Sequence, residues 1–102
     1  MIKYNVTISV DEDITTAWLD WMKKEHIPDV MDTGIFLKAQ ISRIINPSDN
    51  NNTFAITYTC DSMKDLHYYQ VNYATELQQK HIDRYGDKAV PFRTIMEVIQ
   101  EF

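Results

Sequence analysis

Apolar and polar residues alternate strictly at the start of the chain. Ile2, Tyr4, Val6, Ile8 and Val10 occupy the even positions, and Lys3, Asn5, Thr7 and Ser9 the odd ones. A period of two residues predicts a strand with one apolar and one polar face. Three acidic residues follow at positions 11–13. Carboxylates favour a helix amino terminus, so Asp11 or Asp13 is the expected cap of a helix.

The spacing of apolar residues then changes to three and four. The residues at this spacing are Ile14, Ala17, Trp18, Trp21 and Met22. This pattern predicts an amphipathic helix whose tryptophans fill the core. Pro28 stops or restarts a helix, so a second short turn is expected over residues 29–33, ended by Gly34.

The next segments predict a hairpin, a second helix and a last strand. Strand character covers residues 35–45 and 53–60, and the intervening Asn46-Pro47-Ser48-Asp49-Asn50-Asn51-Asn52 is a concentrated turn signal. Ser62 suits a helix cap with Asp65 three residues on, and the helix should run to Tyr85 and stop at Gly86. Its apolar stripe comprises Leu66, Tyr69, Tyr73, Leu77, then His81 or Ile82, and Tyr85. Residues 89–99 alternate again as a strand.

The order βαββαβ predicts one ferredoxin-like α+β domain over residues 1–102. Its four strands would form an antiparallel sheet with both helices on one face. The other face would carry a mixture of polar and apolar side chains, namely Asn5, Thr7, Thr57, Thr59, Arg93 and Glu97 with Ile41, Ile95 and Ile99. Such a surface favours either solvent exposure or pairing with a second sheet around a polar cavity.

Composition narrows the functional classes. The 102 residues include 10 basic and 15 acidic side chains, for a formal charge of −5, and no run of Lys or Arg long enough to cover one face appears. Nucleic-acid binding is therefore not expected. No apolar run approaches the ~18 residues of a membrane span. The single cysteine, Cys60, cannot form an internal disulfide, which favours the cytoplasm.

Two residues are the main candidates for chemistry. His26 stands at the carboxyl end of the first predicted helix, where an imidazole could act as acid, base or ligand. The alternative is that His26 caps the carbonyl groups of its own helix. Arg93, if it points into a barrel, could bind a carboxylate or a phosphate. The alternative is a cross-strand ion pair with Glu97 or a neighbour.

A metal site and a glycine-rich phosphate loop are not expected. His26, His67 and His81 lack the paired spacing of a metal motif, and Cys60 stands alone as a structural thiol. Two glycines cannot build a phosphate-binding loop.

The chain resembles the mostly bacterial domain-of-unknown-function family 4286, within the dimeric α+β barrel superfamily. The residues that carry the resemblance are Tyr4-Asn5-Val6, Trp18 with Trp21-Met22, His26-Ile27-Pro28, Cys60-Asp61-Ser62, Tyr85-Gly86-Asp87 and Phe92-Arg93-Thr94. The superfamily implies a homodimer in which two sheets enclose a barrel, often with a pocket between each sheet and its helices. Its members include small monooxygenases, haem-degrading enzymes, isomerases and ligand-binding domains.

The resemblance also raises haem as a cofactor. Haem-degrading relatives place an Asn on the first strand and a His on the second helix, as Asn5 and His81 stand here. The tryptophan that those enzymes carry on the second helix is absent, and His81 is otherwise expected at a surface helix position.

The leading hypothesis is a cytoplasmic homodimer that binds a small organic ligand or carries out modest cofactor-free chemistry on it. His26 would be the titratable group, and Arg93 with Tyr58 or Asn5 would position the ligand. One alternative is a non-catalytic regulatory or structural dimer. The other is a haem-binding or monooxygenase-like enzyme.

Overall fold

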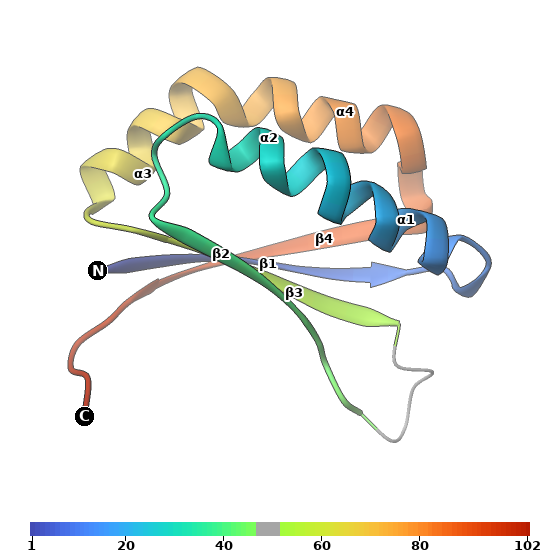
Figure 1. The fold of residues 1–102 in the computed structure, drawn as a ribbon, viewed down its shortest axis with the longest axis horizontal. Coiled ribbons are helices and arrows are strands. Elements are labelled where there is room, and N and C mark those ends of the chain that lie inside the picture. The colour runs from blue at the N-terminus through green and yellow to red at the C-terminus, as the bar shows by residue number, and fades with distance from the viewer. Residues whose placement is uncertain (47–51) are drawn as a thin grey trace.

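The computed structural model describes residues 1–46 and 52–102, and these form one sheet covered by two helical arms. The strands are β1 (Ile2–Val10), β2 (Lys38–Arg43), β3 (Thr53–Cys60) and β4 (Ala89–Glu97), as Figure 1 shows. The turn predicted between β2 and β3 lies mostly in residues 47–51, outside the described part of the chain.

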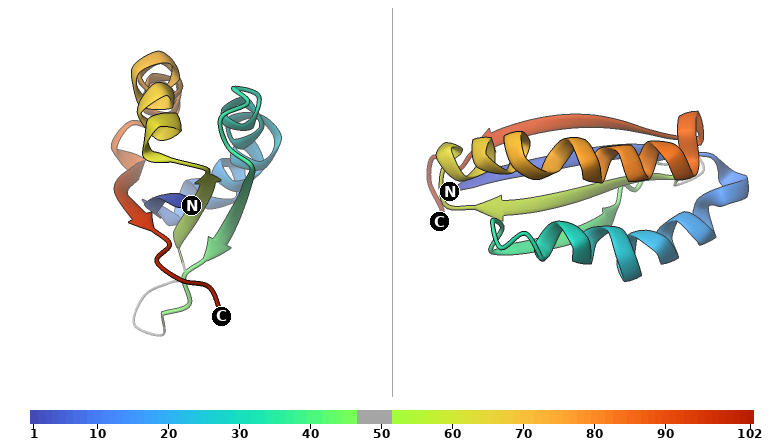
Figure 2. Two further views of the ribbon diagram at one scale, coloured as in Figure 1. Left: turned by 90° about the vertical axis from the view of Figure 1, so that its left-hand side faces the viewer. Right: turned by 90° about the horizontal axis from the view of Figure 1, so that it is seen from above.

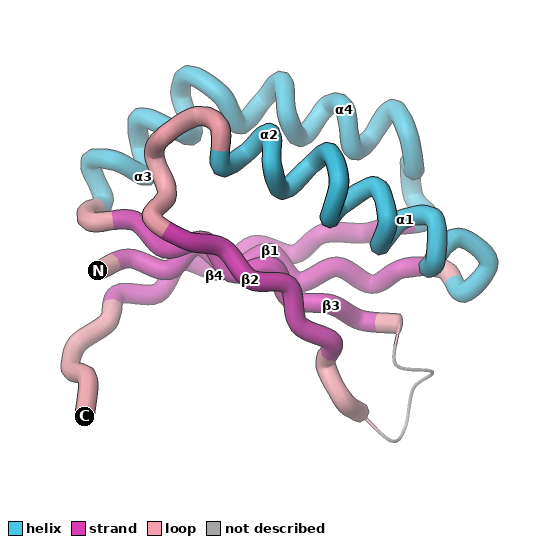
Figure 3. Tube along the Cα trace, viewed as in Figure 1, coloured by secondary structure: helices cyan, strands magenta, loops and turns pink. Residues whose placement is uncertain are grey.

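The four strands pair antiparallel in the order β2-β3-β1-β4. In this order the first strand lies between the third and the last, which is the split-βαβ arrangement. Both helical arms lie on the same side of the sheet, side by side (Figures 2 and 3). The predicted ferredoxin-like fold is therefore confirmed. The strand predicted over residues 35–45 is shorter in the structure, where β2 begins three residues later and ends two residues earlier.

The first helical arm continues through Pro28 instead of stopping there. It consists of α1 (Thr15–Trp21), the π-helical segment Met22–His26 and α2 (Ile27–Met31). Pro28 lies in the first turn of α2, directly after the wider π turn that joins α1 to α2 without a break, so the arm accommodates a residue that has no N–H to donate. The predicted separate turn over residues 29–33 is thus the end of one long arm.

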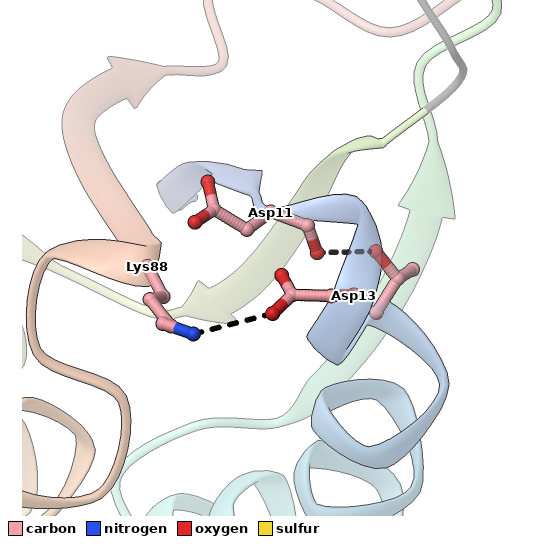
Figure 4. Close-up of polar contacts among 4 residues, drawn as sticks. Asp11, Asp13 and Lys88 are labelled. Carbon is pink, nitrogen blue, oxygen red and sulfur yellow. Dashed lines mark hydrogen bonds and ion pairs between the residues drawn. The ribbon is translucent and has the colours of Figure 1, made fainter.

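The start of that arm also differs from the prediction. Neither acidic side chain caps α1; the Asp11 carbonyl accepts a hydrogen bond from Thr15 Oγ1 at 2.9 Å, and a short 3₁₀ turn, Glu12–Ile14, intervenes. The Asp13 carboxylate is engaged elsewhere, 3.2 Å from Lys88 Nζ (Figure 4). That ion pair ties the start of the first arm to the turn that precedes β4.

The second helical arm matches its prediction closely. It comprises α3 (Met63–Tyr69), the π-helical segment Gln70–Ala74 and α4 (Thr75–Tyr85). The Ser62 hydroxyl accepts a hydrogen bond from the Asp65 backbone N–H at 3.2 Å, as the capping pattern predicts. Gly86 ends the arm with a φ of +57°, a conformation that favours glycine.

The core lies between the helical arms and the sheet. Trp18 is fully buried and its ring centroid lies 5.2 Å from that of Phe54, so the first arm is packed directly onto β3. Burial of a side chain this large dominates the packing energy of a small domain. Cys60 is also fully buried, in agreement with a structural role for its thiol.

The face of the sheet away from the helices, here called the open face, carries the odd-numbered residues of β1. There the amide of Asn5 accepts a hydrogen bond from the Thr57 hydroxyl at 2.9 Å and donates one to the Thr7 hydroxyl at 3.0 Å. In β4 the register places Phe92 opposite Thr7 and therefore on the open face. It also places Arg93 opposite Val6, on the helix side, which corrects the prediction that Arg93 belongs to the other face. No helix in residues 1–46 and 52–102 has the length and apolar character needed to span a membrane.

Candidate ligand-binding cavity

A small cavity lies between the sheet and the two helical arms. Its volume is about 40 Å³, enough for about two or three water molecules. The described residues that line it are Tyr4, Val6, Ile8, Met22, His26, Val30, Ile56, Tyr58, Tyr69, Leu77, Gln78, His81, Pro91 and Arg93. Apolar side chains and side chains with polar groups contribute about equally to this lining.

His81 reaches this cavity from α4 and is held by the opposite arm. Trp18 Nε1 donates a hydrogen bond to His81 Nε2 at 3.0 Å. Because Nε2 accepts, the neutral imidazole carries its proton on Nδ1. Burial, and secondly the positive charge of Arg93, lower the pKa of His81. His81 is buried at 6% exposure, which corrects the prediction of a surface position.

His26 lies at the end of the π-helical segment, half-buried beside two aromatic rings. Its imidazole stacks on the Trp21 indole, with centroids 5.0 Å apart and planes 30° apart, and its centroid lies 5.8 Å from that of His81. Burial lowers the pKa of His26 to about 4, and His81 adds to the effect while Asp29 opposes it. The ring is therefore uncharged near neutral pH, and one of its nitrogens can accept a hydrogen bond.

Three buried tyrosines face each other at the sheet end of the cavity. Tyr4 and Tyr58 are cross-strand partners on β1 and β3, and Tyr69 packs on Tyr4 from α3 with centroids 6.1 Å apart. Burial raises the pKa of Tyr58 and of Tyr69, so both phenols stay protonated. Within the described part of the chain, no protein group forms a hydrogen bond with any of the three hydroxyls. The three hydroxyl oxygens nevertheless keep some accessible surface. Because the rings are deeply buried and line the cavity, we assign this accessible surface to the cavity.

Arg93 is the exposed member of the lining and contributes its positive charge. It lies on the edge strand β4, between Pro91 and Ile95 on the helix-side face. None of the described carboxylates forms an ion pair with it, and the predicted alternative of a pair with Glu97 is not observed among them. The guanidinium therefore remains free to bind a ligand at the mouth of the cavity.

The fold brings together three of the four predicted site residues. His26, Arg93 and Tyr58 line the same cavity, while Asn5 lies on the open face and is bonded to Thr57. The sequence analysis did not name Tyr4 and Tyr69 as site residues, and it considered His81 only as a residue for haem. The signal for His81 was its place four residues after Leu77 and four before Tyr85, a spacing that continues the buried stripe of α4.

Haem does not fit this cavity. A pocket for a ligand of even drug size measures several hundred Å³, whereas this one has about 40 Å³. His81 Nε2 is also occupied by the Trp18 indole, so it cannot serve as an axial ligand in this arrangement. No group of three His, Cys, Asp or Glu side chains suited to a metal ion occurs among residues 1–46 and 52–102.

A four-stranded antiparallel sheet with two helical arms on one face, and a lined cavity between them, defines a ferredoxin-like α+β protein. Residues 1–99 match the family described as "Domain of unknown function (DUF4286)", and the chain belongs to that family. This confirms the resemblance seen in the sequence. Comparison with curated proteins gave no match.

Solved structures show the same fold at low identity. HapK from Hahella chejuensis has a TM-score of 0.73 and 10% identity, covering 100% of this chain and 96% of that one. A structure described as an antibiotic biosynthesis monooxygenase has a TM-score of 0.70 and 12% identity, covering 98% of this chain and 100% of that one. A protein from an uncultured marine organism, described as a dimeric ferredoxin-like protein, has a TM-score of 0.64 and 13% identity, covering 99% and 96%. These likenesses show the fold alone.

Proposed function

We propose that this protein is a cytoplasmic homodimer that binds a small organic ligand in the cavity between sheet and helices. One observation carries the proposal. Uncharged imidazoles, tyrosine hydroxyls without protein partners and an unpaired guanidinium all converge on a single cavity. Polar groups of this kind are normally satisfied inside a protein, and their convergence without partners is characteristic of a site that a ligand completes.

In this proposal the two histidines have different tasks. His26 stacks on Trp21 and accepts no hydrogen bond from the described protein, so its free ring nitrogen can take a proton from a bound ligand. His81 is fixed by Trp18 and positions the adjacent His26 ring. The chemistry accessible to such a pair is proton transfer without a cofactor.

The cavity must widen to admit more than a small head group. Arg93 on β4 is exposed and Gln78 on α4 is half-buried, and both line the cavity. Rotation of these two side chains opens the cavity without disturbing the buried tyrosines. Side-chain rotamer changes of this kind are common when a ligand binds to a preformed site.

The alternative is a non-catalytic dimer, and a separate observation favours it. The open face carries exposed apolar side chains on β4, with Phe92 at 71%, Val90 at 55% and Met96 at 41% exposure. Such a surface associates with a second copy whether or not the cavity is used. A cofactor-free monooxygenase-like enzyme, in contrast, would use the same cavity and His26 as its base.

A fragment screen by thermal denaturation separates these proposals. The screen uses a library of small organic compounds on the wild-type protein, on His26→Ala and on the control His67→Ala, whose exposed ring on α3 does not line the cavity. We expect compounds that raise the melting temperature of the wild type and the control but not of His26→Ala. The three proteins should have the same molar mass in solution, which shows that dimerisation is unchanged. Equal stabilisation of all three proteins would refute the role of His26 in binding, and no stabilisation of any would refute ligand binding at this cavity and leave the non-catalytic dimer.

A further inference from the structure

We infer that the ligand is a singly charged carboxylate, bound with its head group between Arg93 and the hydroxyls of Tyr58 and Tyr69. This inference rests on the proposed function and adds the chemical class of the ligand. It depends on the charges, the hydrogen-bond donors and the size of the cavity, which are three independent properties.

The first property is charge. Of the described residues that line the cavity, Arg93 alone carries a charge near neutral pH, and the lining contains no Asp or Glu. The chain as a whole has a net charge of −5, so this uncompensated cation is a local exception. A guanidinium on a cavity lining that has no carboxylate favours a ligand that supplies the missing negative charge.

The second property is the supply of donors. The phenols of Tyr58 and Tyr69 are protonated and have no protein partner in the described chain, so each has one O–H to donate. A carboxylate has two oxygens that accept several hydrogen bonds, including a bidentate pair from Arg. The donors of the cavity therefore match the acceptors of one carboxylate group.

The third property is size. About 40 Å³ holds about two or three water molecules, so the cavity accommodates only a group of a few heavy atoms, such as one carboxylate. The remainder of the ligand must leave past Arg93, where Pro91 and the 46%-exposed Ile95 share its face of β4. This favours an apolar remainder. A phosphate has a larger tetrahedral head with close to two charges, which one guanidinium does not balance.

The test compares carboxylates with their neutral amides as probes. Sodium acetate and sodium benzoate are titrated against acetamide and benzamide at constant ionic strength, and binding is followed by melting temperature and tryptophan fluorescence. Inorganic phosphate is a third arm. The proteins are the wild type, Arg93→Gln, Tyr58→Phe and the control Arg43→Gln. Arg43 is a matched control because it lies on the same face of edge strand β2, stacked 5.1 Å from the Phe54 ring, and does not line the cavity.

We expect the carboxylates to bind and the amides and phosphate to bind at least tenfold more weakly. Arg93→Gln should weaken carboxylate binding by about tenfold or more, since it removes charge-assisted hydrogen bonds. Tyr58→Phe should weaken it by a few-fold, and Arg43→Gln should bind as the wild type does. This is the pattern that supports the inference.

Other outcomes overturn it in distinguishable ways. Amides or phosphate binding as tightly as the acids, or unchanged carboxylate binding by Arg93→Gln, would refute the carboxylate class. The proposed function would survive that result provided that the neutral fragments still depend on His26. If no probe, charged or neutral, binds at the cavity, both the inference and the proposed function fail.

Discussion

Trp18 on the first helical arm donates a hydrogen bond from its indole Nε1 to Nε2 of His81 on the second, across 3.0 Å. The two residues are 63 positions apart in the chain and both are buried, at 0% and 6% exposure. This one contact therefore joins the arms to each other above the sheet. It also fixes the orientation of the imidazole that lies beside His26, so the packing of the core and the geometry of the cavity depend on the same bond.

Replacing Trp18 by Phe should destabilise the protein substantially. The substitution removes buried apolar area and leaves the acceptor of His81 unpaired, at a cost of about 2–3 kcal/mol in the free energy of unfolding. Urea-induced unfolding of the variant measures this cost. In a double-mutant cycle with His81→Leu, we expect a coupling of about 1 kcal/mol. Additive effects of the two substitutions would contradict an energetically significant bond.

The fold was predictable from the sequence because its signals are local and agree with one another. Three such signals agree with the structure: the alternation in β1, the Ser62 cap at the start of the second arm, and Gly86 at its end. Where the prediction failed, at Pro28, a wider π turn compensated for the missing N–H. That compensation is an adjustment of the backbone for which a single sequence carries no signal.

The stability of the protein should fall as the pH decreases from about 6.5 toward 4. The pKa of His26 is about 4 in the folded protein, against 6.5 for an unperturbed imidazole. In this range the unfolded chain binds more protons than the folded one, so acid favours unfolding, and the full stability is present only above pH 6.5. The lowered pKa of His81 acts in the same direction. The loss assigned to His26 is at most about 3 kcal/mol and is reduced by solvent screening of the half-buried ring.

Urea midpoints measured at several pH values, for the wild type and for His26→Gln, isolate this contribution. The variant should lose less stability than the wild type between about pH 6.5 and 4, because it has lost one group that binds protons preferentially in the unfolded state. Identical pH profiles for the two proteins would show that His26 is not protected in the folded state.

The Cys60 thiol should be unreactive while the protein is folded. Its side chain is fully buried, and burial raises its pKa, so little thiolate forms and reagents cannot reach it. We expect no reaction with a disulfide reagent at mildly alkaline pH in native buffer and complete reaction in denaturing urea. Rapid labelling of the native protein would contradict this packing at the end of β3.

The candidate site was harder to predict than the fold, and β4 shows the physical reason. Its alternation places Phe92 and Arg93 on opposite faces, but the sequence does not say which face is covered by helices. An apolar Phe suggests the inside, yet Phe92 is 71% exposed and Arg93 faces the helices. The usual rule fails here because Arg93 lines the cavity on the helix side, whereas the open face carries apolar side chains. In contrast, the even positions of β3 share the apolar alternation of β1, and this places Tyr58 beside the cavity; whether His26 and Tyr58 bind a ligand stays a prediction.

The exposed Phe92 leads to the last prediction, which concerns association of the chain with itself. Phe92, Val90 and Met96 project from the open face, and solved relatives include a protein described as a dimeric ferredoxin-like protein. If two open faces pair, wild-type protein should have twice the 12.0 kDa chain mass by light scattering. Phe92→Asp should give a monomer, since a carboxylate buried between two sheets without a partner costs several kcal/mol per interface.

The matched control is Ile82→Asp, at a 52%-exposed apolar position on α4, away from the open face. This variant should remain a dimer, which separates a specific interface from general loss of solubility. Both variants should keep the circular dichroism of the wild type, because neither position belongs to the buried core. A wild-type monomer at all concentrations would contradict the dimer, and so would a Phe92→Asp protein that associates as the wild type does. Neither result would affect the proposal for the cavity, because each chain forms the cavity from its own residues.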